Sequence, residues 1–163
     1  MPSTRYFPPV AVAVTTWRLL SGRISFPGDH AGKILTMEDG EAHVVFREVR
    51  VASSRSVPTE SMTVLKVRFK FASFSPTVNR RLSLIPIPVI TGMPGFRQKV
   101  WTFCEEIGYS HGIYQFESMG LAEEYRRSPV MRILEKRTVP GSISYELFSG
   151  VLIEEYLENR LNR

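Results

Sequence analysis

The chain has 163 residues, of which 43% are hydrophobic, enough for one domain with a substantial core or for one domain with an extension. Its 21 basic and 16 acidic residues give a net charge of +5, but no run of cations is longer than two, and this scatter argues against a nucleic-acid partner. The longest stretch without a charge, residues 82–96, is interrupted by prolines and glycines, so neither a membrane span nor a membrane partner is expected.

Two further features narrow the class of protein. Cys104 is the single cysteine, which excludes an internal disulfide and a zinc site built of thiolates. The apolar run of residues 10–14 is followed by Trp17 and Arg18, where a secretory cleavage site would need small residues. We therefore expect a cytoplasmic protein.

The N-terminal residues 1–62 carry strand signals and little sign of helix. The β-branched run over residues 10–20 predicts a strand. Asp39-Gly40 lies between two extended runs and predicts a hairpin over residues 33–51, because both central positions of such a turn need positive φ. Residues 52–61 are polar and contain a proline, as is typical of a linker. We expect residues 1–62 to form a β-rich extension to a domain of residues 63–163.

The pattern becomes sharper after residue 63. Apolar residues alternate with cations over residues 63–71, which is the period of a strand with one apolar and one cationic face. Ser75-Pro76 then predicts the start of a short helix, with serine as the cap and proline at the first helical position. We expect this helix to end near Leu84 and to lead into an extended connection, because Pro86 and Pro88 remove backbone donors.

The second half of the domain contains a hairpin, helices and a last strand. Residues 92–118 hold two runs rich in β-branched and aromatic residues, joined by a short polar loop that contains Gly108, and predict the hairpin. Residues 119–136 have a helical apolar face that Pro129 should divide into two short helices. A strand over residues 143–148 and a terminal helix over residues 151–161 complete the domain.

The order strand, helix, strand, strand, helix, strand predicts an α+β fold of the ferredoxin-like type, an antiparallel sheet with its helices on one face. The other face would then be open. Large side chains such as Trp101 and Phe103 near an uncovered face would be expected to find a partner, and a second copy of the chain can supply one. We therefore expect a homodimer.

Strand alternation predicts a polar interior on this second face, where an anionic or phenolic small molecule could bind. The alternative is that the charges there pair with one another. The residues expected on this face are Lys66, Arg68, Lys70, His111, Gln115, Glu117 and Glu146. All of them except His111 are candidates for binding the substrate.

His111 begins a strand beside Gly112 and is the most interesting of the three histidines. Its imidazole could act as a general base or ligate a haem iron, and the alternative is a surface histidine at the end of a hairpin. No two histidines or carboxylates have the helical spacing of a metal site, so no metal of the usual motif type is expected.

Several short motifs in the domain suggest a family. They resemble the monooxygenases of the dimeric α/β-barrel superfamily, and among these the YdhR-type proteins, distant relatives of the antibiotic-biosynthesis monooxygenases. The resemblance covers about residues 63–148 and implies that two ferredoxin-like protomers pack sheet to sheet as a barrel. The residues that carry it are Asn79, Ile85-Pro86, Pro94-Gly95-Phe96-Arg97-x-Lys99-x-Trp101, Gly112-x-Tyr114-x-Phe116-Glu117-Ser118, Ala122-Glu123-x-Tyr125, Ser128 and Pro140-Gly141-Ser142-x-Ser144-Tyr145-Glu146.

The resemblance also implies candidate chemistry. Cofactor-free oxygenases of the superfamily use an Asn, a Trp and a Tyr or His beside an electron-rich substrate, and Asn79, Trp101, Tyr114 and His111 are residues of these kinds. Our leading hypothesis is a monooxygenase without a cofactor acting on an aromatic or polycyclic molecule; haem remains an alternative cofactor. An isomerase, cyclase or lyase that transfers protons through His111 or Glu117, and a ligand-binding protein without activity, are the other hypotheses.

Overall fold

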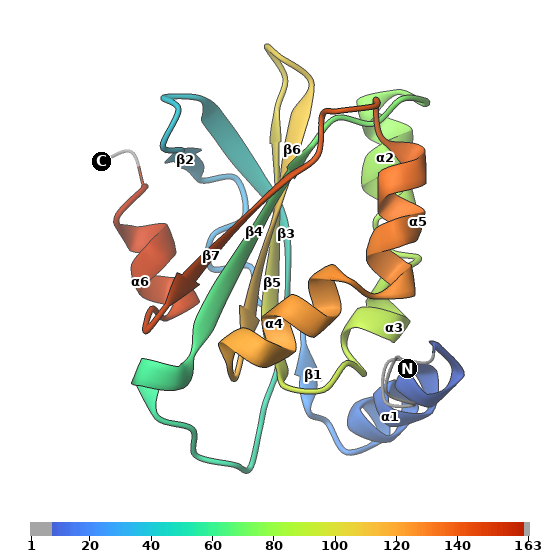
Figure 1. Ribbon diagram of the computed structural model, residues 1–163, viewed down its shortest axis with the longest axis vertical. Helices are drawn as coiled ribbons and strands as arrows, with labels where there is room; N and C mark the ends of the chain where they lie inside the picture. Colours follow the sequence, from blue (N-terminus) through green and yellow to red (C-terminus); the bar gives the residue numbers. More distant parts are fainter. Residues whose placement is uncertain (1–7, 162–163) are drawn as a thin grey trace.

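The protein, described here as a computed structural model, is defined over residues 8–161, so residues 1–7 of the predicted extension and the last two residues lie outside the described part. The chain forms one mixed α+β unit (Figure 1). The helices are α1 (Pro8–Leu20), α2 (Pro76–Leu82), α3 (Ile87–Ile90), α4 (Met119–Arg126), α5 (Pro129–Arg137) and α6 (Ile153–Glu158), with a 3-10 turn at Thr59–Ser61. The strands are β1 (Ile24–Ser25), β2 (Ile34–Thr36), β3 (Ala42–Val51), β4 (Thr63–Phe69), β5 (Phe96–Cys104), β6 (Tyr109–Phe116) and β7 (Ser144–Ser149).

All seven strands join one antiparallel sheet in the order β1-β3-β5-β6-β4-β7, with β2 pairing with β3. The strands β5, β6, β4 and β7 have the neighbour order of the ferredoxin-like unit, which confirms the predicted fold class. The N-terminal strands continue the sheet beyond β5. The N-terminal segment is therefore built into the same sheet as the ferredoxin-like unit.

The local signals at turns and helix starts are confirmed. Strands β2 and β3 pair as the predicted hairpin, and Gly40 in its turn has φ +83. Ser75, Ser118 and Ser128 each accept a hydrogen bond from a backbone N–H three residues ahead, at the starts of α2, α4 and α5. Pro129 lies in the first turn of α5, so the two predicted short helices form.

The strand predicted over residues 10–20 is wrong, because this segment is helix α1. The helix packs on α3: Thr15 donates a hydrogen bond to the carbonyl of Pro88, and Arg18 donates to that of Thr91. Gly92 lets the two backbones approach, since a Cβ there would lie 1.8 Å from the carbonyl oxygen of Ala11. Tertiary packing thus overrides the β preference of the valines and threonines.

The extended connection predicted around Pro86 and Pro88 is also wrong. Residues Ile87–Ile90 form α3, with Pro86 as its N-cap and Pro88 in its first turn. Proline is tolerated there because the first turn needs no amide donors.

The two faces of the sheet are both covered (Figure 1). Leu65, Val67 and Phe69 of β4 lie in the larger core, under α2 to α5. The alternate residue Val64 lies in a second core on the opposite face, which α6 and β2 cover with Leu35 and Leu157. Trp101, expected near an uncovered face, belongs to the larger core instead. The chain therefore buries by itself the face for which a partner was expected, and no helix of residues 8–161 is long and apolar enough to cross a bilayer.

Candidate functional site

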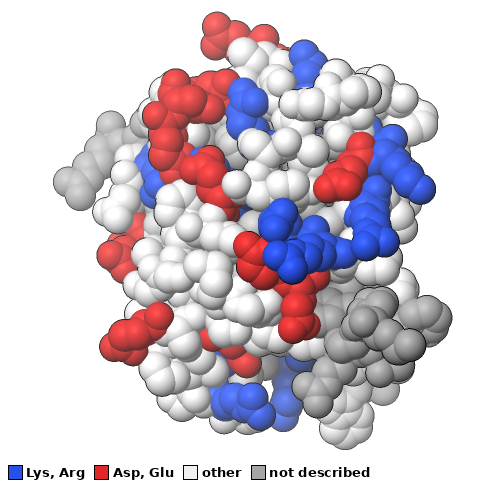
Figure 2. Space-filling model, in the orientation of Figure 1, with Lys and Arg blue, Asp and Glu red and all other residues white. Residues whose placement is uncertain are grey.

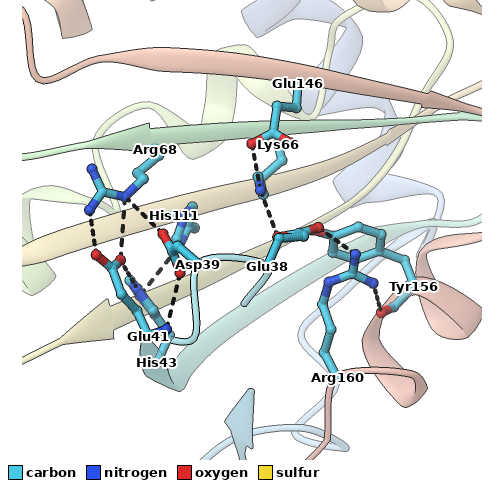
Figure 3. Close-up of polar contacts among 10 residues, drawn as sticks. All are labelled: Glu38, Asp39, Glu41, His43, Lys66, Arg68, His111, Glu146, Tyr156 and Arg160. Carbon is cyan, nitrogen blue, oxygen red and sulfur yellow. Dashed lines mark hydrogen bonds and ion pairs between the residues drawn. The ribbon is translucent and has the colours of Figure 1, made fainter. Parts of the chain in front are cut away.

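Two of the three cations predicted to line a binding cavity on the second face, Lys66 and Arg68, are engaged in ion pairs (Figure 3). The prediction for Lys70 is wrong, because this residue follows β4 and lines a cavity on the helix-covered face. Lys66 is buried, and its Nζ lies 2.7 Å from Glu38 and 2.6 Å from Glu146. Glu38 also accepts hydrogen bonds from Tyr156 and Arg160, from the end of the chain. Burial alone would raise the pKa of Glu38, but the hydrogen bonds from Lys66 and these other donors lower it to about 2.

Arg68 is held in the same way. Its guanidinium donates to both carboxylate oxygens of Glu41 and lies over the ring of Tyr109, 3.6 Å from the centroid. Asp39 is 3.5 Å away. The turn between β2 and β3 thus supplies carboxylates that neutralise Lys66 and Arg68 of β4. On this face the charges pair with one another, as in the alternative stated above, and do not line a binding cavity.

His111 lies in the same cluster, packed against His43. Their Nδ1 atoms are 3.3 Å apart and their ring centroids 4.3 Å apart, with both side chains buried (Figure 3). Burial, with the charges of His43, Lys66 and Arg68, lowers the pKa of His111 to about 2. A neutral imidazole enclosed by protein has a structural role here.

Two further candidates of that face also hold the fold together. Gln115 accepts a hydrogen bond from the backbone N–H of Ile153 and donates one to the carbonyl of Val151, which fixes the start of α6. Glu117 pairs with Arg97 at 2.9 Å.

The cavity of the protein lies instead on the helix-covered face. It has a volume of about 430 Å³ and lies between the sheet and the helices α2, α3 and α5. That volume is in the range of small-molecule sites. Its walls are mainly aromatic and aliphatic, from Phe46, Phe69, Phe71, Phe74, Ile85, Val89, Trp101, Phe103, Tyr114, Tyr125, Ile133 and Leu134.

Three of the sequence-predicted catalytic candidates meet in this cavity. Trp101 of β5 and Tyr114 of β6 form part of its sheet wall, and Asn79 of α2 lies across from them. The Tyr114 ring lies over Gly112, where a Cβ would come within 2.8 Å of it. Asn79 donates from Nδ2 to the carbonyl of Phe74, while its Oδ1 is buried with no hydrogen-bond partner in the described chain. His111, the fourth candidate, is not among the lining residues.

Lys99 is a lining residue that the sequence analysis did not select. It is buried, and its Nζ lies 4.1 Å from the ring centroid of Trp101 and 4.4 Å from that of Tyr114. Burial, and then the charge of Arg47, lowers the pKa of Lys99 well below its usual range. The sequence did contain a signal for Lys99, because it lies two residues before Trp101 and four before Phe103. In a strand, this spacing puts all three side chains on one face.

The remaining charged groups of the lining are all cationic. Lys70, Arg80 and Arg137 join Lys99, and no Asp or Glu occurs among the described lining residues. On the face shown in Figure 2 basic and acidic side chains lie beside one another. The cavity is thus a local exception to a mixed surface, and it favours an anionic ligand.

The fit of a haem group can be judged from the donors at the cavity. His30, His43 and His111 all lie outside the lining. Among the described lining residues there is then no imidazole for an axial ligand, so the residues present do not provide the histidine-ligated haem site considered above.

Comparison with known proteins supports the fold. No family model and no curated protein matches the chain. An uncharacterized ferredoxin-fold protein from Listeria monocytogenes, related to antibiotic biosynthesis monooxygenases, aligns over 77% of this chain and 90% of its own, with 9% identity and a TM-score of 0.51. A monooxygenase-like protein from Listeria innocua aligns over 69% and 66%, with 10% identity and a TM-score of 0.50. A heme-degrading enzyme from Listeria monocytogenes aligns over 82% and 92%, with 11% identity and a TM-score of 0.51.

The chain therefore has the ferredoxin-like fold found in proteins related to antibiotic biosynthesis monooxygenases. At such low identity the likeness shows the fold alone, because one fold carries many activities. The narrower YdhR-type resemblance stays a prediction.

Proposed function

We propose that the protein is an oxidoreductase of monooxygenase type, without flavin or metal, that acts on an aromatic or polycyclic small molecule bearing an acidic group. The observation that carries this proposal is the lining of the cavity on the helix-covered face. Its walls are rich in aromatic rings, and it has four basic side chains with no carboxylate among the described lining residues. Flat apolar ligands stack on such walls, and an acidic group would neutralise the cations.

The other residues of the cavity have roles in this proposal. Trp101 and Tyr114 provide a wall for the substrate ring, and the unpaired Oδ1 of Asn79 would accept a hydrogen bond from a substrate hydroxyl. The substrate itself would supply the electrons for the reaction with oxygen. The structural neighbours described as monooxygenase-like and as related to monooxygenases support this choice of reaction class.

We further propose that one chain forms a complete site. The sheet face that would form a barrel with a second copy is covered by α6 and β2, and the cavity lies on the opposite face, under the helices. The predicted homodimer is therefore not needed to build this cavity.

Ligand binding can be tested by tryptophan fluorescence. Trp17 is exposed and Trp101 lines the cavity, so a Trp17→Phe protein reports from the cavity alone. We expect hydroxylated naphthalenes and anthraquinones to quench the fluorescence of Trp101, and Arg80→Gln to weaken their binding severalfold. Arg81→Gln is the matched control, because Arg81 is the adjacent residue and does not line the cavity.

Activity is tested with an oxygen electrode on the ligands that bind. We expect oxygen uptake that depends on both protein and ligand and that is lost in Trp101→Ala. Tight binding of the whole panel with no oxygen uptake would refute the oxygenase and leave a ligand-binding protein. The hypothesis of proton transfer by His111 or Glu117 receives no support from the cavity, since neither residue lines it.

A further inference from the structure

Lys99 reaches the cavity because of an irregularity in β5. The pairing of β5 with β6 shifts between Phe96 and Gln98. A bulge of one residue reverses the alternation of side chains, so that Phe96 and Lys99 both face the helices. In a regular strand without a bulge they would lie on opposite faces. The fold thus directs a lysine into an apolar cavity through a local departure from regular pairing.

The two buried lysines, Lys66 and Lys99, have different surroundings. Lys66 has carboxylates at 2.7 and 2.6 Å. Lys99 is equally buried, yet its Nζ has neither an ion pair nor a hydrogen bond with any described residue, and it lies over the faces of Trp101 and Tyr114. Buried lysines that serve stability are paired. The Nζ of Lys99 is therefore free to pair with a molecule bound in the cavity that it lines.

The surroundings of Lys99 favour an uncharged amine in the empty cavity. The charged groups near it are Arg47 on β3 and three lining residues, all of the same sign. The lining residues are Lys70, directly after β4, Arg80 on α2 and Arg137 on α5. Burial and the charge of Arg47 lower the pKa of Lys99, and the faces of the two rings offset this only in part. A free amine in an apolar cavity is a competent base.

We propose that Lys99 is the base of this site, and that its amine accepts the proton of a phenolic or enolic hydroxyl on the bound molecule. The O–H bond breaks, the N–H bond forms, and the electron pair stays on the ligand oxygen, so that an ammonium and a phenolate are left as a buried pair. No oxidant or reductant takes part. The inference rests on the proposed function and deepens it, since a phenolate or enolate is the electron-rich form of such a substrate.

The chemistry of the cavity also selects this class of acid. A carboxylic acid is already ionised at neutral pH and would have to lose its hydration before it entered. A phenol or enol enters uncharged through the apolar walls and becomes charged only beside Lys99. The proton transfer thus places the charge where the cavity holds its cations.

The experiment uses a ligand whose colour reports its ionisation. The full-length protein is titrated under argon with 2-hydroxyanthraquinone, which absorbs at longer wavelength as the phenolate. We expect the bound dye to show the phenolate spectrum below the pH at which the free dye ionises, an increase of at least tenfold in its acid dissociation constant. Lys99→Met is expected to bind the dye with the spectrum of the phenol.

Two controls separate this effect from damage to the cavity. The methyl ether of the dye has no proton to give, and we expect it to bind equally well to the wild type and to Lys99→Met. Arg80→Gln is expected to weaken the binding of the dye while the bound dye keeps the phenolate spectrum.

Each outcome decides one point. A phenol spectrum in the wild type, or a phenolate spectrum in Lys99→Met, would overturn the role of Lys99 while leaving the cavity as a binding site. If the wild type gives the phenolate spectrum, Lys99→Met gives the phenol spectrum, and the wild type consumes no oxygen, the role of Lys99 as a base is supported and the oxygenase is refuted. No binding of either dye would overturn both.

Discussion

Acid is expected to destabilise the protein through the buried histidine pair, well before its carboxylates are protonated. The Nδ1 atoms of His43 and His111 are 3.3 Å apart, so one nitrogen must donate and the other accept. If both rings were protonated, two N–H groups would face each other in a buried site. The pKa of each histidine is accordingly lowered, chiefly by burial.

The size of the effect follows from the pKa of His111. It is about 2 in the folded protein, against 6.5 for an ordinary histidine. The unfolded chain therefore binds more protons below pH 6.5, and the free energy of unfolding falls by about 1.4 kcal/mol for each further pH unit. His111 alone should thus cost about 2 kcal/mol at about pH 5, a large part of a typical stability of about 5–15 kcal/mol. His43 acts in the same direction, and Glu48, whose pKa is raised by burial, acts in the opposite one.

Urea unfolding between about pH 7.5 and pH 5 measures this dependence, above the range in which Glu38 titrates. The matched variant His111→Asn removes the titrating group, and we expect a clearly smaller dependence on pH whatever the variant costs in stability at neutral pH. A wild-type stability that stays flat across this range, or an Asn variant with the full wild-type slope, would refute the reasoning.

The remaining predictions concern packing, ion pairs and assembly. Gly92→Ala should lose about 1–3 kcal/mol in urea unfolding and loosen α1 from α3, because its Cβ would meet the backbone of Ala11, whereas Gly28→Ala, with no atom within 4 Å, should be close to neutral. The double substitution Glu38→Gln with Glu146→Gln should lose about 3–5 kcal/mol, because it leaves the buried ammonium of Lys66 without a carboxylate. Glu146→Gln, half exposed, should lose about 1 kcal/mol or less, and equal losses would contradict this account. Light scattering should give the monomer mass of 18.6 kDa, since the second sheet face is covered within the chain; a stable mass twice as large would show another interface.

The sequence by itself determined the elements whose signals are local. The alternation in β4, the Asp39-Gly40 turn and the cap of α2 at Ser75 depend on φ angles, on side-chain direction and on backbone donors within a few residues. These elements in their chain order were enough for the ferredoxin-like unit. The predicted hairpin of residues 92–118 put Trp101 and Tyr114 on adjacent strands, and the cavity wall includes both.

Only the tertiary structure decided which face of the sheet holds the cavity. The cations of β4 are neutralised by carboxylates from the turn after β2, a contact between segments that no periodicity connects. A bulge in β5 between Phe96 and Gln98 puts Phe96 and Lys99 on the same face, and a one-residue irregularity is invisible to a pattern that assumes regular pairing. Helix α1 formed against its own β preference because α3 offered a surface where Gly92 lets the two helix backbones approach. Pairing, register and close approach are properties of distant segments brought together, and for this reason they had to be read from the folded chain.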